Sequence, residues 1–196
     1  WHMFENDEFR KARLAILIAF LINGFSVGNF VSRIPDYKYE LEISNGVLGA
    51  ALFCASIGVL AALRPTSRAA AKYGSGPVVK FSAFTLALAV PSVGLLFNLP
   101  WFLFSLFIYG VLSSIHDLSI NAHAAALENR AGKRVMSTFH AMWSIGGLTG
   151  GAIGGLLASV NVSILFHAIG VGIFIVLVAF ATRNWFLPAD ADQHVI

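Results

Sequence analysis

An acidic residue inside an apolar segment is the strongest chemical signal in this sequence. Of the ten acidic residues, only Asp117 lies within a hydrophobic run, and the others lie near the termini or between such runs. A carboxyl group at membrane depth is costly unless it is protonated, paired or in contact with water. Asp117 is therefore a candidate for proton binding and release, with a buried hydrogen-bonding role as the alternative.

Amide and guanidinium side chains lie where they could meet a solute beside this carboxylate. Asn121 follows Asp117 by four residues, so the two share a helical face. Asn23 is expected at a similar depth in the first apolar segment, ~15 Å from the surface. Because these groups bind hydroxyls, we predict substrate contacts for Asn23, Asn29, Asn121 and Arg33. An ordinary interface charge is the alternative for Arg33.

Histidines and one tryptophan extend the candidate site. His116 is the best second proton carrier because imidazole titrates near neutrality, although an interhelical hydrogen bond is an equal alternative. His140 and Trp143 lie one helical turn apart, and an aromatic ring beside hydrogen-bonding groups is typical of sugar sites. Packing is the alternative for both. We expect neither metal nor cofactor, because HxxH and HExxH spacings are absent.

Long apolar segments must position these residues. The chain has 196 residues, of which 57% are hydrophobic and 12% charged, whereas a soluble domain carries about 25% charge. Uncharged stretches long enough to span a bilayer cover residues 14–32, 43–63, 81–115 and 135–182. A soluble protein is therefore excluded. A β-barrel is also excluded, because no alternation of period two is sustained.

Two breaks divide the longer stretches. Pro100 disfavours helix at the residue before it, and Asn161 marks a weaker break. Pro91 is expected to kink the third helix. The sequence therefore predicts an all-α membrane protein with six transmembrane helices, at about residues 12–32, 45–63, 77–97, 100–126, 137–159 and 162–182. Residues 10–187 form this domain, between a cloning remnant with a cytoplasmic segment (1–9) and a tail (188–196).

Charge and composition add orientation and symmetry. Basic residues gather in the loops of one side, and only Arg33 and Lys38 fall on the other, so we expect both termini in the cytoplasm. The first and fourth helices are polar, the second and fifth are rich in small residues, and the third and sixth are apolar. This pattern favours an inverted 3+3 repeat. A four-residue glycine spacing in the fifth helix predicts close packing at Gly147, Gly150, Gly151 and Gly154.

Three stretches of the sequence carry a family resemblance: residues 30–35 (FVSRIP), 112–128 and 136–148 (MSTFHAMWSIGGL). They resemble the major facilitator superfamily, and within it the N-terminal half of the fucose-permease-like branch of sugar transporters. The resemblance covers about residues 10–187. It implies that the first and fourth helices line a central cavity, and that Asp117 is the matching proton-coupling carboxylate.

The sequence departs from this pattern in three places. Relatives in that branch also tend to carry a carboxylate in the first helix, where this chain has Asn23. The loop between helices 2 and 3 keeps Gly74 but has Ala71 at the usual aspartate position, so its gating salt bridges are in doubt. Such transporters have twelve helices, whereas six are predicted here.

These observations predict a half-sized secondary transporter for a small polar solute, a sugar first of all, coupled to protons. Its expected partners are the solute, protons, the lipid bilayer, and either a second copy or a complementary six-helix half. A non-transporting receptor or assembly subunit, or a uniporter, is the alternative. We expect no enzyme, since catalytic motifs such as GxSxG are absent, and no nucleic acid, since the basic residues are distributed as membrane anchors.

Cysteine labelling in intact cells tests the orientation, after Cys54 has been replaced. A cysteine at Lys38 should react with an impermeant maleimide and one at Lys133 should not, because the charge asymmetry places them on opposite sides. Lysed cells provide the control, since both positions should then react. The reverse pattern in intact cells would contradict cytoplasmic termini.

Overall fold

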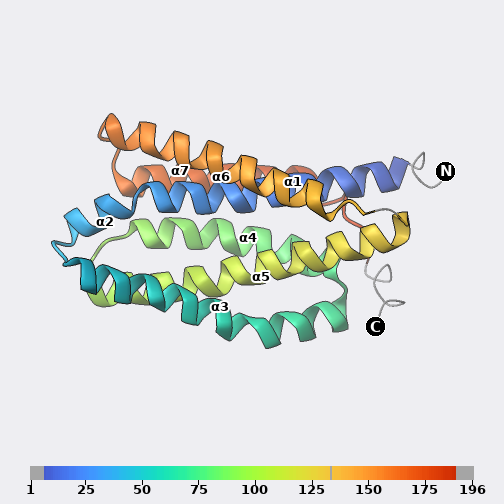
Figure 1. The fold of residues 1–196 in the computed structure, drawn as a ribbon, viewed down its shortest axis with the longest axis horizontal. Helices are drawn as coiled ribbons and strands as arrows, with labels where there is room; N and C mark the ends of the chain where they lie inside the picture. Colours follow the sequence, from blue (N-terminus) through green and yellow to red (C-terminus); the bar gives the residue numbers. More distant parts are fainter. Residues whose placement is uncertain (1–6, 133, 189–196) are drawn as a thin grey trace.

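Helices make up nearly all of the computed structural model, which describes residues 7–132 and 134–188 (Figure 1). Six of the helices in the described part are long and apolar enough to cross a membrane, which confirms the predicted number. In chain order the helices are α1 (Asp7–Ser32), α2 (Ile34–Glu40), α3 (Asn45–Tyr73), α4 (Ser75–Gly94), α5 (Leu99–Ala131), α6 (Met136–Ser159) and α7 (Ile164–Thr182). Lys133, the predicted cloning remnant and the tail beyond Pro188 lie outside the described residues.

Several helices extend past the boundaries expected from hydropathy. α3 continues through Pro65 to Tyr73 and ends only at Gly74, whose φ of 81° suits glycine. α1 and α5 also include charged residues, α1 at its start and α5 at its end. The physical reason is that a helix can leave the apolar layer without unfolding. The short helix α2 was not predicted. The break near Asn161 is observed between α6 and α7, and Pro91 lies within α4 as expected.

Glycines bring α1 and α6 into backbone contact. A Cβ atom at Gly24 would collide with the carbonyl oxygen of Trp143, and one at Gly28 with that of Gly147. In the other direction, a Cβ atom at Gly150 would collide with the carbonyl oxygen of Phe25. The glycine stripe of α6 therefore packs within the chain. A Cβ atom at Gly154 would meet the side chain of Ser32 rather than backbone, whereas Gly147 and Gly151 have more room.

A second pair of helices repeats this arrangement. α3 packs along α5, where Gly58 faces the carbonyl oxygen of Phe107 and Gly110 faces that of Ala55. Thus α1, the first of the first three membrane-spanning helices, packs on α6, the middle one of the last three. In the same way α3, the middle one of the first three, packs on α5, the first of the last three. Such an exchange is what an inverted 3+3 repeat requires.

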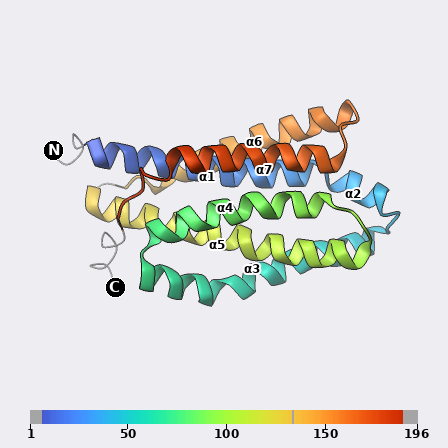
Figure 2. The ribbon, with the colours of Figure 1, turned by 180° about the vertical axis from the view of Figure 1, so that it is seen from behind.

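The two ends of the bundle differ in charge. α1 begins, and α7 ends, at the same end of the bundle (Figures 1 and 2). The α3–α4 and α5–α6 connections lie there too, together with most of the described basic residues, among them Arg10, Lys72 and Arg134. The opposite end carries α2 and the α4–α5 and α6–α7 connections. The predicted orientation of the chain in the membrane rests on this grouping of the loops.

Two helices remain largely uncovered. In the 18-residue apolar stretch of α3, and in that of α6, only 17% is buried, whereas 50% is buried in the corresponding stretches of α1 and α4. Large side chains such as Phe53 and Leu60 on α3, and Leu148 and Leu156 on α6, are exposed. The core instead lies between α1, α4, α5 and α7. The faces of α3 and α6 are thus available to lipid or to another helical unit.

Replacing Gly150 by alanine tests the α1–α6 seam. The new methyl group would meet the Phe25 carbonyl oxygen, so α1 and α6 must separate, which should destabilise the fold by about 1–3 kcal/mol. Gly155→Ala is the matched control, because a Cβ atom there meets nothing within 4 Å. Thermal unfolding in detergent measures both. Equal melting temperatures for the two variants would contradict the described seam.

Candidate functional site

Asp117 lies on α5 with its carboxylate half-exposed and without a hydrogen bond or ion pair among the described residues. One turn further, the Asn121 amide donates to the backbone carbonyl of Asp117, with an N–O distance of 2.8 Å. That bond fixes the asparagine and leaves the carboxylate free. The structure thus keeps Asp117 and Asn121 together, as their spacing predicts.

His140 on α6 is a neighbour of Asp117. Its side chain is exposed and lies close enough to the Asp117 carboxyl group for an electrostatic interaction. The ring packs edge-on against Phe20 of α1, with 5.3 Å between the ring centroids. A carboxylate from α5 and an imidazole from α6 therefore share one open face of the bundle, where both can meet solute or a proton.

Trp143 joins this face to α1. Its indole Nε1 donates to Asn23 Oδ1 over 2.9 Å, which fixes the half-exposed ring. Asn23 itself is buried, and its Nδ2 has no hydrogen-bond partner in the described chain. Asn23 is thus placed to orient Trp143, and it retains one unused donor. Asp117 and Asn121 thus share a face of α5, His140 and Trp143 lie one turn apart on α6, and Asn23 lies behind Trp143; their joint role in substrate binding stays a prediction.

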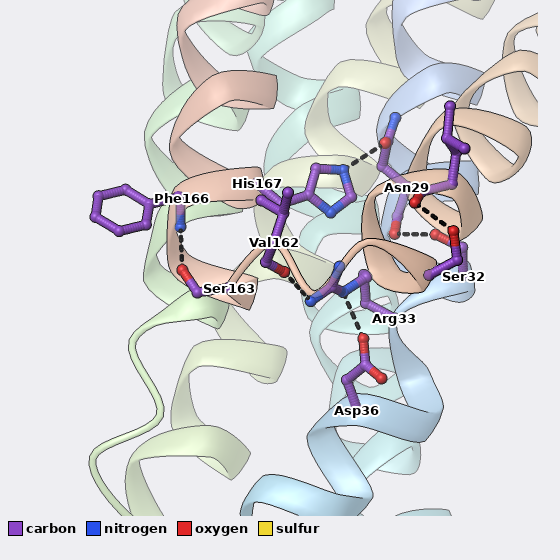
Figure 3. A network of polar contacts seen from close by, with 10 residues as sticks. Asn29, Ser32, Arg33, Asp36, Val162, Ser163, Phe166 and His167 are labelled. Atoms are coloured by element: carbon purple, nitrogen blue, oxygen red, sulfur yellow. Dashed lines mark hydrogen bonds and ion pairs between the residues drawn. The ribbon is translucent and has the colours of Figure 1, made fainter.

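The other polar residues of α1 face the interior of the bundle. Ser26 bonds the hydroxyl of Tyr109 on α5 over 3.1 Å. Asn29 Oδ1 bonds His167 Nε2 on α7 over 2.7 Å (Figure 3). Asn29 is 3% exposed and lies in a cluster at the far end of α1 from Asp117's site. α1 turns this side chain towards its partner in α7, and the predicted contact between Asn29 and substrate stays a prediction.

Arg33 belongs to the same cluster as Asn29 and His167 (Figure 3). One guanidinium nitrogen, Nη2, donates to the Val162 carbonyl over 2.7 Å, and Nε lies 2.6 Å from Asp36 Oδ2 (Figure 3). Only 4% of Arg33 is exposed, so it is not an ordinary interface charge. It ties α1 and α2 to the α6–α7 connection, because a buried guanidinium must find acceptors.

The histidines of α5 are packed between helices. His116 is fully buried, and its Nδ1 bonds Ser82 of α4 over 3.1 Å. His123 bonds Ser75 over 2.7 Å and accepts from the Leu187 amide. His116 thus lies behind the face that carries Asp117, and its role as a proton carrier stays a prediction.

Two contacts that position the site were not anticipated from the sequence. Glu128 Oε2 accepts from the backbone amides of Val135 and Met136, at 2.6 and 2.8 Å, and so fixes the start of α6 just before His140. An acid shortly before a helix start is a capping signal that could have been noticed. The Ser26–Tyr109 pair carried no such signal, because its members lie 83 residues apart.

No group of three metal-binding side chains occurs among the described residues.

The sequence profile of the Major Facilitator Superfamily matches residues 16–194, which is most of the chain. The chain belongs to the major facilitator superfamily. Its fold agrees with this: it superimposes on the crystal structure of the nucleoside transporter NupG with a TM-score of 0.74 at 14% identity, over 94% of this chain and 46% of that one. The predicted half of a major facilitator fold is thereby confirmed.

Curated relatives of this superfamily member are described as transporters or membrane proteins. An uncharacterized transporter of Sinorhizobium fredii is 30% identical over 74% of the chain and 38% of its own length. An uncharacterized MFS-type transporter of Yersinia pestis is 24% identical, over 90% and 46% respectively. The membrane protein MosC of Rhizobium meliloti is 28% identical, over 69% and 33%. The chain thus spans less than half the length of the relatives it matches.

Removing the indole N–H tests how Trp143 is held. Trp143→Phe keeps the aromatic surface but leaves the buried Asn23 amide without its only hydrogen bond from the described chain, which should cost about 1–3 kcal/mol of stability. Leu148→Ala, at a side chain of the same helix that is 74% exposed, is the surface control and should change the unfolding free energy by less than about 0.5 kcal/mol. Detergent melting curves compare the two, and an unchanged Phe variant would show that the bond contributes nothing.

Proposed function

We propose that the chain is one six-helix half of a secondary active transporter that carries a small polar solute, a sugar first of all, together with protons. Membership of a transporter superfamily supports the general activity. The position of Asp117 supports proton coupling. Solute binding is assigned to the open face formed by α5 and α6, with α1 behind it.

The unpaired carboxylate of Asp117 is the observation that carries this proposal. Neither a hydrogen bond nor an ion pair from the described residues holds its charge, and its exposure leaves it open to solvent or solute. A carboxyl group in an apolar span that is not committed to structure is suited to take up and release a proton during transport. The buried polar residues of α1, in contrast, are engaged in packing.

The neighbours of Asp117 favour a hydroxylated solute. The Trp143 ring offers an apolar face, Asn121 retains its amide oxygen, and His140 is exposed beside them. An aromatic face with a few polar groups is how protein sites bind sugars. The resemblance to the fucose-permease-like branch supports the same class. Contact between the solute and Asn29 or Arg33 would require the cluster that these residues form with His167 to open.

A second six-helix unit is needed to close the cavity. The described helices leave α3 and α6 uncovered, and they leave Asp117 and His140 on an open face that would be costly against lipid. We propose that another unit packs on this face. It is a second copy, a separately encoded half, or further sequence of a longer polypeptide. In keeping with the charge asymmetry, the basic end of the bundle is assigned to the cytoplasm.

Asp117→Asn tests the proton-coupling role. The substitution keeps shape and removes titration, so pH-driven accumulation should fall to the level of empty liposomes while the protein stays folded. Downhill exchange should survive, because exchange does not require proton release from an empty carrier. The assay is uptake of radiolabelled neutral hexoses and pentoses by proteoliposomes under an imposed pH gradient. Glu40→Gln, which removes an exposed carboxylate of α2, is the matched control.

The outcomes separate the competing functions. Accumulation by the Asn variant equal to that of the parent would exclude Asp117 as the proton carrier and make His116 the next candidate. If sugar uptake by the parent protein does not depend on the pH gradient, the protein is a uniporter. Absence of any solute-dependent flux or proton movement, with the chain alone and with a co-reconstituted partner half, would favour a receptor or assembly subunit.

A further inference from the structure

A small chamber lies at the end of the bundle opposite the chain termini, away from Asp117. It has a volume of about 20 Å³ and lies between α1, α2, α4, α5 and α7. A space of roughly 10–15 Å³ is enough for one water molecule. Its polar lining comes from Asn29, Arg33, Tyr37, Tyr109 and His167, and Phe30 with valine, isoleucine and alanine side chains completes it.

Hydrogen bonding determines which atoms of the lining are unused. Asn29 Nδ2 donates to the Phe25 carbonyl over 2.8 Å, so its Oδ1 is an acceptor. His167 Nε2, 2.7 Å from this oxygen, must therefore carry a proton. The neutral ring then has its lone pair on Nδ1, which faces Arg33 (Figure 3). Arg33 in turn has an unpartnered buried donor, Nη1.

We propose that one water molecule occupies the chamber, where it accepts from Arg33 Nη1 and donates to His167 Nδ1, and that this bridge makes the outer ends of α1, α2 and α7 an acid-sensitive latch. A water molecule supplies the acceptor that Nη1 lacks and the donor that a neutral Nδ1 requires. The bridge connects two groups that are buried and therefore costly to leave unpaired.

Acid sensitivity follows from the charges around His167. Because Nε2 already bears a proton, an added proton must bind Nδ1, on the side of the Arg33 guanidinium. From α2, the Asp36 carboxylate faces the cluster as the one anion there among the described residues, and Tyr37 stays neutral because burial raises the pKa of its hydroxyl. Tyr109 of α5 is neutral as well, and α4 contributes valines. Two cations would then face one carboxylate, which weakens the latch.

Comparing thermal unfolding at pH 8 and pH 5.5 tests the latch. His167→Gln keeps a donor at the position of Nε2 but cannot titrate. On acidification the parent should lose about 2–4 °C more in melting temperature than this variant. The remaining histidines are present in both proteins, so their contributions cancel. Equal acid-induced losses would overturn the proposal.

Two further measurements keep the test independent of a folding defect. Asp36→Asn removes the compensating anion without changing His167, so its acid-induced loss should exceed that of the parent; a smaller loss would count against the latch. A high-resolution crystal structure at neutral pH should show one water within hydrogen-bonding distance of Arg33 Nη1 and His167 Nδ1. An empty chamber, or a direct bond between the two nitrogens, would refute the bridge.

Discussion

The backbone contact between α1 and α6 is the constraint on which the rest of the structure depends. Gly24 and Gly28 allow α6 to lie directly against α1, and Gly146 and Gly150 allow the reverse approach. Since the helices meet without intervening side chains, Trp143 is brought within hydrogen-bonding distance of Asn23. The same approach turns His140 towards the face of α5 that carries Asp117. In a membrane, where helices gain little from leaving lipid, close packing of this kind supplies much of the association energy.

The seam also separates two kinds of polar residue. Those on α1 point inward and are paired with α5, α6 and α7, so they hold the bundle together. Those on the open face of α5 and α6 are half-exposed or exposed and are little used in packing. Whether a polar side chain is buried and paired, or exposed and unpaired, is therefore a physical criterion for a functional role. Residue type alone does not provide it. Asn29 and Asp117 are both polar residues within apolar segments, yet of the two only Asp117 has a side chain without a hydrogen-bond partner among the described residues.

The sequence predicted the elements better than their contacts. Length and charge sufficed for the number of spans, and Asn161 and Pro91 were correctly interpreted as a break and an internal proline. The end of α3 was missed because hydropathy reports the edge of the apolar layer, whereas the helix ends at Gly74. The direction of Arg33 was not predictable, because its acceptor is a carbonyl 129 residues away in the sequence. Asp117 and Asn121 were easier, since neighbours on one helix keep their spacing in the fold.

The long sequence separations within the α1 polar stripe have a consequence for biosynthesis. Its partners on α5, α6 and the α6–α7 region lie 83 to 138 residues further along the chain. At about 5–20 residues per second, α1 therefore leaves the ribosome several seconds before it can be satisfied. During that interval two asparagines and an arginine that end up buried, Asn23, Asn29 and Arg33, must remain in a hydrated or protein-lined environment. Completion of this domain is thus a late event, which depends on how long the insertion machinery retains its first helix.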